Sequence, residues 1–435
     1  MSPLTIGLLG FVILFGLLAV GTPIATALGL VGFVGMCFLY PFSGAIVKMA
    51  TVPFEVIGNY QLAVLPLFLL MAQITFASGF GKDLFNLASK WLGHLRGGLG
   101  MAAIGGATGF AACSGSSLAT AATVGLVALP EMKQFDYDKR FAAGCVAAGG
   151  TIGSLIPPSG MFIIYGILSG TSIGKLFAAS LIPALLTIAA YMVTIYLLCW
   201  RNPRLGPPVP KTSFREKMRA FKACWELLAL LTFVVGGMVY GLFTATEAGA
   251  VGAFGSVALA ALRRRLTWSI LSKAVMDTMK TTGMIYAIML GAFIFNYFCA
   301  KTTLPEVAAA WISGLKIPPA AVISVIMVIY FFLGMVMEAP SIQILTLPVF
   351  YPIVVTTLGF DPVWFGVVQV RMLEITLITP PLGMVAYILS GVDKDLSLAD
   401  VFRGTTPFLL MELVTMPLIM FIQPITMWLP NLLMK

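Results

Sequence analysis

Two apolar stretches of this chain are interrupted in their middle by a Pro-Pro pair. The first, residues 144–170, reads GCVAAGGTIGSLIPPSGMFIIYGILSG. The second, residues 378–391, reads ITPPLGMVAYILSG and repeats the Pro-Pro pair, a following Gly, a Tyr and the closing Ser-Gly. Proline removes a helical hydrogen bond, so neither stretch is expected to form one regular membrane-spanning helix. The sequence therefore predicts a broken helix in each half of the chain, the pattern of a site that is built twice.

The composition predicts an all-α polytopic membrane protein. Of the 435 residues, 59% are hydrophobic and only 10% are charged, a balance far outside that of soluble globular proteins. The first apolar segment lacks a basic n-region and a small-residue cleavage site, so we expect a retained span and not a signal peptide. The net charge of +9 lies mainly in short loops between spans, which indicates topology in a lipid bilayer and no nucleic-acid partner.

The cysteines and the single histidine argue against several kinds of site. The six cysteines show no C-x-x-C spacing, so neither a disulfide framework nor a metal centre is indicated. The only histidine, His94, lies in a loop sequence. Zinc sites and Ser-His hydrolase sites need histidine near the reacting groups. We expect no organic cofactor and no enzymatic activity.

The first half is predicted to contain spans, an interfacial helix, a hairpin and the first broken helix. The expected ranges are 4–20, 24–40, 61–79 and 175–200 for the spans and 44–60 for the interfacial amphipathic helix. A polar loop is expected around Lys82, Lys90 and Arg96. Residues 97–129 carry CSGSS at their centre, and each side is shorter than the ~20 residues of a spanning helix. We therefore expect a re-entrant hairpin with its tip at 113–117.

The second half repeats this order. The expected ranges are 225–243, 247–262, 284–300 and 400–425 for spans, 266–283 for an amphipathic helix, and 319–355 for a hairpin with its tip at 334–341. Thr244 follows Thr22, and Ser341 follows Ser117, at nearly the same distance along the chain. If the hairpins do not cross the membrane, each half crosses an odd number of times. The repeat is then inverted, with opposite orientations of the two halves.

A basic segment separates the halves and predicts their orientation. Residues 201–222 contain seven Lys and Arg residues and a single acid, Glu216. We expect a cytoplasmic linker at 201–224 between a first repeat at 1–200 and a second at 225–435. This orientation places most of the 26 Lys and Arg residues inside, and both termini on the outer side.

The hairpin tips and helix breaks are predicted to meet near the midplane of the membrane. Unwound carbonyls and hydroxyls there suit a sodium ion, and helix N-termini suit an anion. The expected sodium ligands are Ser114, Gly115, Gly150, Thr151, Gly153, Gly334, Ser341, Thr376, Thr379 and Pro380. The expected substrate contacts are Ser116, Ser117, Glu338, Arg371 and Thr379. The alternative for any single Ser or Gly is close packing of helices through small residues.

Ionisable residues at membrane depth are costly, so each needs a role. Arg371 either binds the acidic head of a substrate or neutralises Glu374, which lies three residues further along the helix, or Glu338. Glu247 follows a turn and is expected to cap or brace the neighbouring helix and not to touch substrate.

Several long motifs carry a resemblance to a known family. They are GTPIATALG, HLRGGLG, SGSS, FAAGCVAAGGTIGSLIPPSG, IYGILSGTSIGKLF, GLFTATEAGAV, GFDPVWFGVV and ITPPLG. Together they resemble the large membrane subunit of tripartite ATP-independent periplasmic (TRAP) transporters across essentially the whole chain. TATEA stands where that family often has TPTEA, and Arg371 stands in a stretch that is usually uncharged.

The resemblance implies sodium-coupled symport of a small organic anion, a carboxylate or a sulfonate, by an elevator movement in the bacterial inner membrane. It also implies two partners, a periplasmic substrate-binding protein and a small four-helix membrane subunit. Two other functions are compatible with some of the features. An intramembrane enzyme would use Ser114 or Ser116 as its nucleophile but lacks a histidine base, and a passive channel would also use broken helices.

Overall fold

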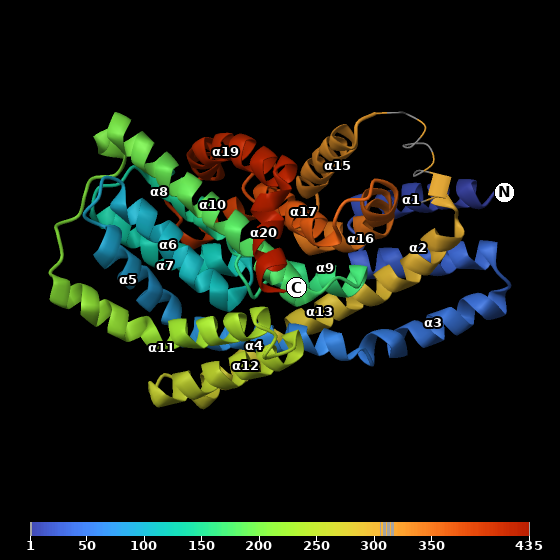
Figure 1. Cartoon of the computed structure of the whole chain (residues 1–435), viewed down its shortest axis with the longest axis horizontal. Coiled ribbons are helices and arrows are strands. Elements are labelled where there is room, and N and C mark those ends of the chain that lie inside the picture. The colour runs from blue at the N-terminus through green and yellow to red at the C-terminus, as the bar shows by residue number, and fades with distance from the viewer. Residues whose placement is uncertain (1, 305, 308–309, 311–313, 315–316, 435) are drawn as a thin grey trace.

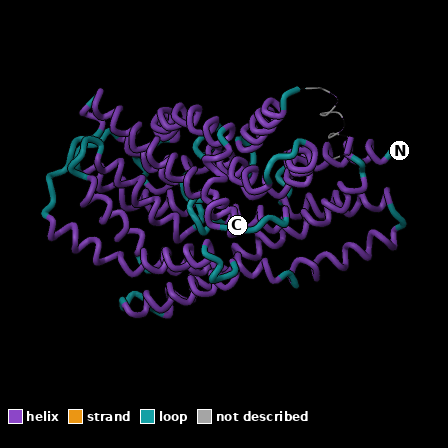
Figure 2. The backbone as a smooth tube through the Cα atoms, viewed as in Figure 1, coloured by secondary structure: helices purple, strands orange, loops and turns teal. Residues whose placement is uncertain are grey.

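A computed structural model describes residues 2–434 except 305, 308–309, 311–313 and 315–316. Within these residues the regular elements are helices, joined by short loops, and no strand is present (Figure 2). Seven of the described helices are long and apolar enough to cross a membrane. The predicted all-α fold is confirmed.

The N-terminal helices follow the prediction closely. They are α1 (Pro3–Ala19), α2 (Ile24–Leu39), α3 (Phe42–Ile57) and α4 (Val64–Ala77), the last preceded by a short 3-10 turn at Tyr60–Ala63. The polar loop expected around Lys82 and Lys90 is wrong, because helix α5 (Phe80–Leu92) occupies it. Leu84 and Phe85 of α5 are buried against the next helix while Lys82 faces outward. The charged residues of this segment led to the prediction of a loop, although its apolar residues lie on one face of a helix.

The first hairpin and the first broken helix form as predicted. The hairpin consists of α6 (Gly98–Ser114) and α7 (Ser117–Gln134), and its tip is Gly115-Ser116. Gly115 has a φ of +55°, a left-handed conformation that favours glycine. The broken helix consists of α8 (Lys139–Gly150) and α9 (Gly160–Ser169), followed by the span α10 (Ile173–Arg201).

The connection between the halves is shorter than predicted. Helix α11 (Phe214–Val239) begins inside the expected linker at 201–224, because Ser213 and Glu216 form a capping box at its start. Helix α12 (Ala245–Leu262) begins with a second capping box between Thr244 and Glu247, which confirms the capping role expected for Glu247.

Helix α13 (Trp268–Lys301) is one continuous helix, whereas an amphipathic helix and a separate span were expected there. In the first half the chain leaves the helix at Gly58 and Asn59, between α3 and α4. The corresponding part of α13 contains one glycine, Gly283, which has helical backbone geometry. A Cβ at this position would have no other atom within 4 Å. The two halves therefore differ at this point.

The second hairpin and the second broken helix also form as predicted. The helices are α15 (Pro319–Gly334), α16 (Ala339–Tyr351), a π-helical turn at Pro352–Thr357, α17 (Pro362–Thr376), α18 (Met384–Val392) and α19 (Leu398–Phe421). A further helix, α20 (Gln423–Leu433), follows the last expected span. Both helix breaks contain a cis Pro-Pro bond, at Pro157-Pro158 and at Pro380-Pro381.

The two hairpins approach the centre of the molecule from opposite sides. In Figure 1 the first hairpin, α6 and α7, lies on the left, and the second, α15 and α16, lies on the right. Helices α2, α4, α12 and α13 pack on one another and form a frame along one side. The hairpins and broken helices therefore meet beside this frame.

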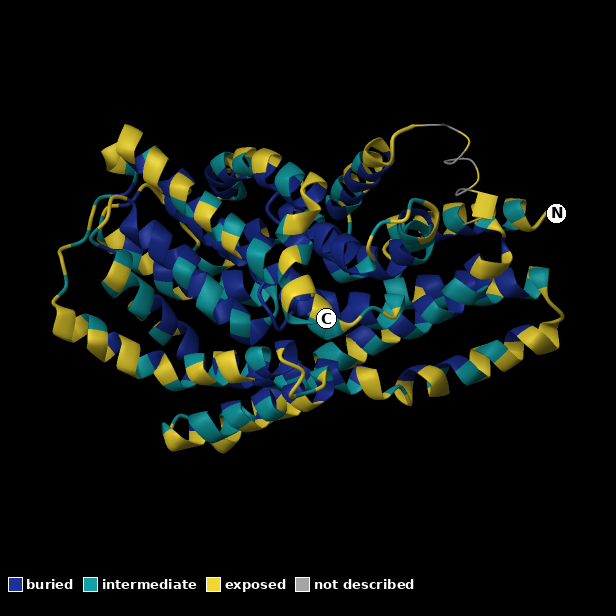
Figure 3. Cartoon of the chain, viewed as in Figure 1, coloured by how far each residue is buried: buried dark blue, intermediate teal, exposed yellow. Residues whose placement is uncertain are grey.

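The edge of the molecule formed by α3, α11 and α12 has many exposed apolar side chains. Figure 3 shows exposed residues along α3, α11 and α12, at the lower edge of the molecule. These exposed residues include the large apolar side chains Phe54, Phe233, Phe254 and Leu262. Exposed large apolar side chains of this kind face lipid in a membrane protein.

Candidate functional site

A cavity of about 270 Å³ lies where the hairpin tips and the helix breaks meet. Its wall contains the first residue of four helices: Ser117 of α7, Gly160 of α9, Ala339 of α16 and Met384 of α18. A helix N-terminus presents the positive end of the helix dipole. Four such ends around one cavity suit a negatively charged group.

The tip of the first hairpin is held against the first helix break. The Gly160 N–H donates to the Gly115 carbonyl at 3.4 Å. A Cβ at Gly115 would collide with the Pro158 carbonyl oxygen, and a Cβ at Gly153 would lie 2.6 Å from Ser117 Cα. These glycines allow the backbone of the hairpin tip to touch the backbone of the helix break.

Glu374 of α17 reaches across to this tip from the other half of the chain. The Ser117 hydroxyl donates to the Glu374 carboxylate, and Ser117 Oγ also lies 3.1 Å from Ser154 Oγ. Glu374 is 1% exposed and forms part of the cavity wall. No Lys, Arg or His within the described ranges forms an ion pair with it.

A buried carboxylate without a cationic partner is energetically costly. A carboxylate with neighbouring hydroxyl oxygens is also a donor set that a hard cation prefers. Sequence reasoning missed Glu374 as a site residue, because it assigned this carboxylate to Arg371 on the same helix. Its position opposite a Ser-rich tip could not be read from local spacing.

Arg371 is paired with Glu412 of α19, so the alternative of a pairing with Glu374 or Glu338 is wrong. Its guanidinium also donates to Tyr191 Oη at 3.1 Å and to the Thr151 carbonyl at 3.4 Å. Arg371 is fully buried and does not belong to the cavity wall. The structure therefore does not bring this arginine, expected to contact substrate, to the cavity.

The signal for Glu412 was present in the sequence. It is a lone acid within the apolar run FLLMELVTM, and such an acid needs a partner inside the protein. Arg371 and Glu412 lie on different helices, so the sequence does not show that Glu412 pairs with Arg371.

The tip of the second hairpin is packed against the second helix break. A Cβ at Gly334 would collide with the Thr376 side chain. The Thr376 and Thr379 hydroxyls donate to carbonyls of their own helix, at 2.6 and 2.8 Å. Ser341 is fully buried, and its hydroxyl has no hydrogen-bond partner among the described residues. The carboxylate of this tip is that of Glu338, which precedes α16 and is exposed.

The predicted site residues thus fall into two groups. In the cavity wall are Ser114, Gly115, Ser116, Ser117 and Glu338. Outside the wall, in the tips, the breaks and α17, are Gly150, Thr151, Gly153, Gly334, Ser341, Arg371, Thr376, Thr379 and Pro380, of which Pro380 is exposed. The Thr151 carbonyl is already occupied by Arg371, which makes it unsuited to a sodium ion in this conformation.

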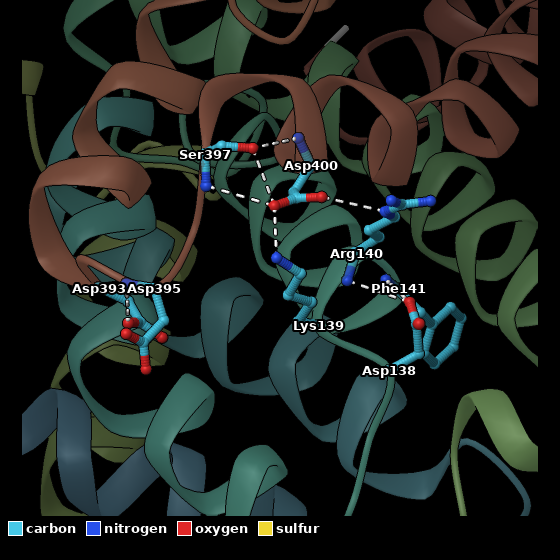
Figure 4. Close-up of polar contacts among 8 residues, drawn as sticks. All are labelled: Asp138, Lys139, Arg140, Phe141, Asp393, Asp395, Ser397 and Asp400. Carbon is cyan, nitrogen blue, oxygen red and sulfur yellow. Dashed lines mark hydrogen bonds and ion pairs between the residues drawn. The ribbon is translucent and has the colours of Figure 1, made fainter.

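The first broken helix is anchored to α19 at its N-terminal end (Figure 4). The Asp400 carboxylate accepts from Lys139 Nζ at 2.7 Å and from Arg140 Nε at 3.0 Å. Asp138 caps α8 by accepting from the Arg140 and Phe141 N–H groups. Further along, α8 and α19 cross at Gly144 and Gly404, where neither position has room for a Cβ.

A separate exposed ion pair lies nearby, between Lys133 and Asp395. The hydrogen bond from the Lys133 ammonium, together with its charge, lowers the pKa of Asp395. Asp395 lies beside Asp393 in Figure 4, away from the Asp400 cluster. Exposed pairs of this kind contribute little to stability.

Comparison with known families gives a match along most of the chain. Residues 11–425 match the family model described as "Tripartite ATP-independent periplasmic transporter, DctM component".

Individual relatives match over nearly their whole length. The chain is 36% identical to the C4-dicarboxylate TRAP transporter large permease protein DctM of Pseudomonas aeruginosa, over 93% of this chain and 94% of that protein. It is 36% identical to the 2,3-diketo-L-gulonate TRAP transporter large permease protein YiaN of Escherichia coli, with coverage of 91% and 92%. It is 32% identical to the sialic acid TRAP transporter large permease protein SiaM of Vibrio cholerae, with coverage of 96% of both chains.

A solved structure has a similar fold. The crystal structure of the Alcanivorax borkumensis YdaH transporter superposes with a TM-score of 0.57 at 15% identity. The similarity covers 85% of this chain and 88% of that chain. At this identity the match concerns the fold alone.

Proposed function

The chain belongs to the DctM family of TRAP transporter large permease proteins, and from that premise we propose that it carries a small organic anion across the bacterial inner membrane together with sodium ions. It is a multi-pass membrane protein, and its matched relatives are named as permeases and not as enzymes. The substrates in the names of those relatives, C4-dicarboxylates, 2,3-diketo-L-gulonate and sialic acid, are all organic acids or their anions.

The observation that carries this proposal is the cavity formed by four helix starts and Glu374. The helix N-termini provide a positive potential for an acidic group without any basic side chain. Ser116 and Ser117 add hydroxyls at the same wall. We place the acidic group of the substrate at these helix starts.

The cation is assigned to the tips and breaks, with Glu374 as its negatively charged ligand. Glu374, Ser117 and Ser154 provide three side-chain oxygens from three separate segments. The backbone of the first break packs directly on Ser117, since a Cβ at Gly153 would lie 2.6 Å from Ser117 Cα. Ser341, without a partner at the second tip, is a candidate ligand of a second, uncharged site.

Electrostatics explains why the two solutes would move together. Glu338 and Glu374 both form part of the cavity wall, and two carboxylates repel an anion. A sodium ion beside Glu374 removes part of that repulsion before the anion binds. Coupling then follows from the charge of the site.

An elevator movement fits the position of the cavity. One side of the cavity is formed by the hairpins and broken helices, and the other by Leu65, Phe68 and Leu69 of α4 with residues of α13. In an elevator movement the hairpins and broken helices would slide as one body along α4 and α13. The side of the cavity formed by α4 and α13 is mainly apolar, so this sliding would break few hydrogen bonds. The frame would stay fixed in the membrane with the small four-helix subunit, and a periplasmic binding protein would deliver the substrate.

Reconstitution in proteoliposomes tests the proposal. The chain is combined with the small subunit and binding protein of its own system, and uptake of the acid bound by that binding protein is measured. We expect uptake driven by an inward sodium gradient, saturation with substrate, and counterflow. Uptake that is unchanged when choline replaces sodium would reject the coupling, and a rate that does not saturate would indicate a channel. Full activity of the chain alone would remove the two partners from the proposal.

A further inference from the structure

The charge of the cavity limits how many acidic groups a substrate can carry. Among the residues that the structure describes, no lysine, arginine or histidine forms part of the wall, whereas Glu338 and Glu374 both do. Arg371 lies behind the wall and is already paired with Glu412. The helix starts are thus the positive features that the wall offers to an anion.

A second acidic group on the substrate would therefore meet no basic side chain among the described residues of the wall. A charge removed from water without a partner is strongly unfavourable. A bound sodium ion at Glu374 offsets the buried negative charge of the wall, whereas Glu338 is exposed and forms no ion pair among the described residues. With two carboxylates and no basic side chain among the described residues of its wall, the cavity disfavours a second negative charge on the substrate.

The side of the cavity that faces the frame is hydrocarbon. It is formed by Leu65, Phe68 and Leu69 of α4 and by Met284, Ile285 and Ile288 of α13. Within the described residues, the one hydroxyl that this side contributes is that of Thr281. A substrate body rich in hydroxyl groups would lose its hydrogen bonds to water there and gain almost none. A hydrocarbon body would gain from the burial of its apolar surface.

From these two properties, and resting on the proposed function, we infer that the substrate is a monocarboxylate with an apolar body. Its carboxylate lies at the starts of α7, α9, α16 and α18, and its hydrocarbon part packs against α4 and α13. A cavity of about 270 Å³ restricts the body to a short chain or a single ring. This class differs from a C4-dicarboxylate, which has a second charge, and from sialic acid, which has many hydroxyl groups.

Binding of three acids with the same chain length tests the inference. Hexanoate has one carboxylate and an alkyl chain, adipate has a second carboxylate, and gluconate has a hydroxylated chain. The purified complex of the chain with its small subunit is titrated with each acid in sodium and in choline, and heat of binding is recorded. We expect hexanoate to bind at least tenfold more tightly than the other two, and only in sodium.

The outcomes separate this inference from the proposed function. Tighter binding of adipate or gluconate, or no binding of hexanoate in a complex that sodium still stabilises against heat, would overturn the monocarboxylate inference alone. A complex that sodium neither stabilises nor activates would instead reject the proposed coupling.

A substitution in the hydrocarbon side gives a second, independent test. Ile288→Arg introduces a cation opposite the helix starts and should shift the ratio of adipate to hexanoate affinity by at least tenfold toward adipate. Ile288→Met, of similar volume, should leave that ratio unchanged. If Ile288→Arg does not fold, Leu69→Lys on the neighbouring helix is used in the same way. An unchanged ratio in a folded variant with the added cation would overturn the assignment of this side to the substrate body.

Discussion

Arg371 of α17 and Glu412 of α19 form a fully buried ion pair that joins the second broken helix to the helix behind it. Tyr191 Oη accepts from the same guanidinium, and the Thr415 hydroxyl donates to the other oxygen of Glu412 at 2.9 Å. The Arg371 guanidinium also holds the Thr151 carbonyl of the first helix break. One arginine thus links segments from both halves of the chain.

Removing one partner of this pair should destabilise the protein strongly. Arg371→Gln or Glu412→Gln leaves an uncompensated buried charge, which costs about 3–5 kcal/mol. The double variant Arg371→Gln with Glu412→Gln should recover most of that loss, since no unpaired charge remains. Thermal unfolding of the purified complex measures both effects.

Glu374 provides the matched control for the choice of partner. Combining Arg371→Gln with Glu374→Gln should give no recovery, because Glu374 contacts Ser117 and not Arg371. Recovery with Glu374→Gln and not with Glu412→Gln would contradict the pairing in the structure.

The crossing of α8 and α19 should tolerate no added methyl group. A Cβ at Gly404 would collide with the Arg140 carbonyl oxygen, and a Cβ at Gly144 with the Gly404 carbonyl oxygen. Both obstacles are backbone atoms, so relief needs a shift of a whole helix. Gly404→Ala should therefore lower the free energy of unfolding by about 1–3 kcal/mol.

The control is a glycine in a helix with open space around it. Gly236 of α11 has no atom within 4 Å of a built Cβ. Gly236→Ala should leave stability unchanged or raise it by up to about 1 kcal/mol. Equal effects at Gly236 and Gly404 in thermal unfolding would show that the close crossing is not present in the membrane.

The repeated breaks were predictable because they depend on local chemistry. Pro157-Pro158, Pro380-Pro381 and the glycine at Gly115 interrupt a helix wherever they occur. Helix α5 was not predicted, because its charged residues indicate a polar loop. The continuous α13 was not predicted either, because the sequence around Gly283 does not show whether the helix continues there. Helix α5 packs on the first hairpin, and α13 forms one side of the cavity, so both errors affect elements next to the site.

The candidate site was predictable in its segments and not in its contacts. Ser114 to Ser117 and Glu338 lie in the cavity wall as the tips suggested. The contacts of Glu374 with Ser117 and of Arg371 with Glu412 join residues far apart in the chain. Periodicity reports which face of a helix is buried, and it carries no information on which distant helix covers that face.

The orientation of the chain is predicted from its basic loops. A cysteine at Lys211 should lie in the cytoplasm and a cysteine at Ser2 in the periplasm, because the 201–213 connection is rich in Lys and Arg. In a variant without the native cysteines, a membrane-impermeant maleimide added to whole cells should label position 2 and not position 211. Inverted membrane vesicles should give the opposite result. Labelling of position 211 in intact cells would overturn the inverted-repeat topology.

Glu374 should determine the affinity for sodium. Glu374→Gln keeps the volume and the contact with Ser117 but removes the negative charge beside Ser154. A contact with a charged partner contributes about 1.5–3 kcal/mol, so the sodium concentration for half-maximal uptake should rise about tenfold or more. The maximal rate at saturating sodium should fall much less, because the helix starts that bind the anion are unchanged. Asp395→Asn, which removes an exposed acid paired with Lys133, is the control and should leave sodium activation unchanged. If Glu374→Gln and Asp395→Asn show the same sodium dependence as the unmodified protein, Glu374 is not a ligand of the coupling ion.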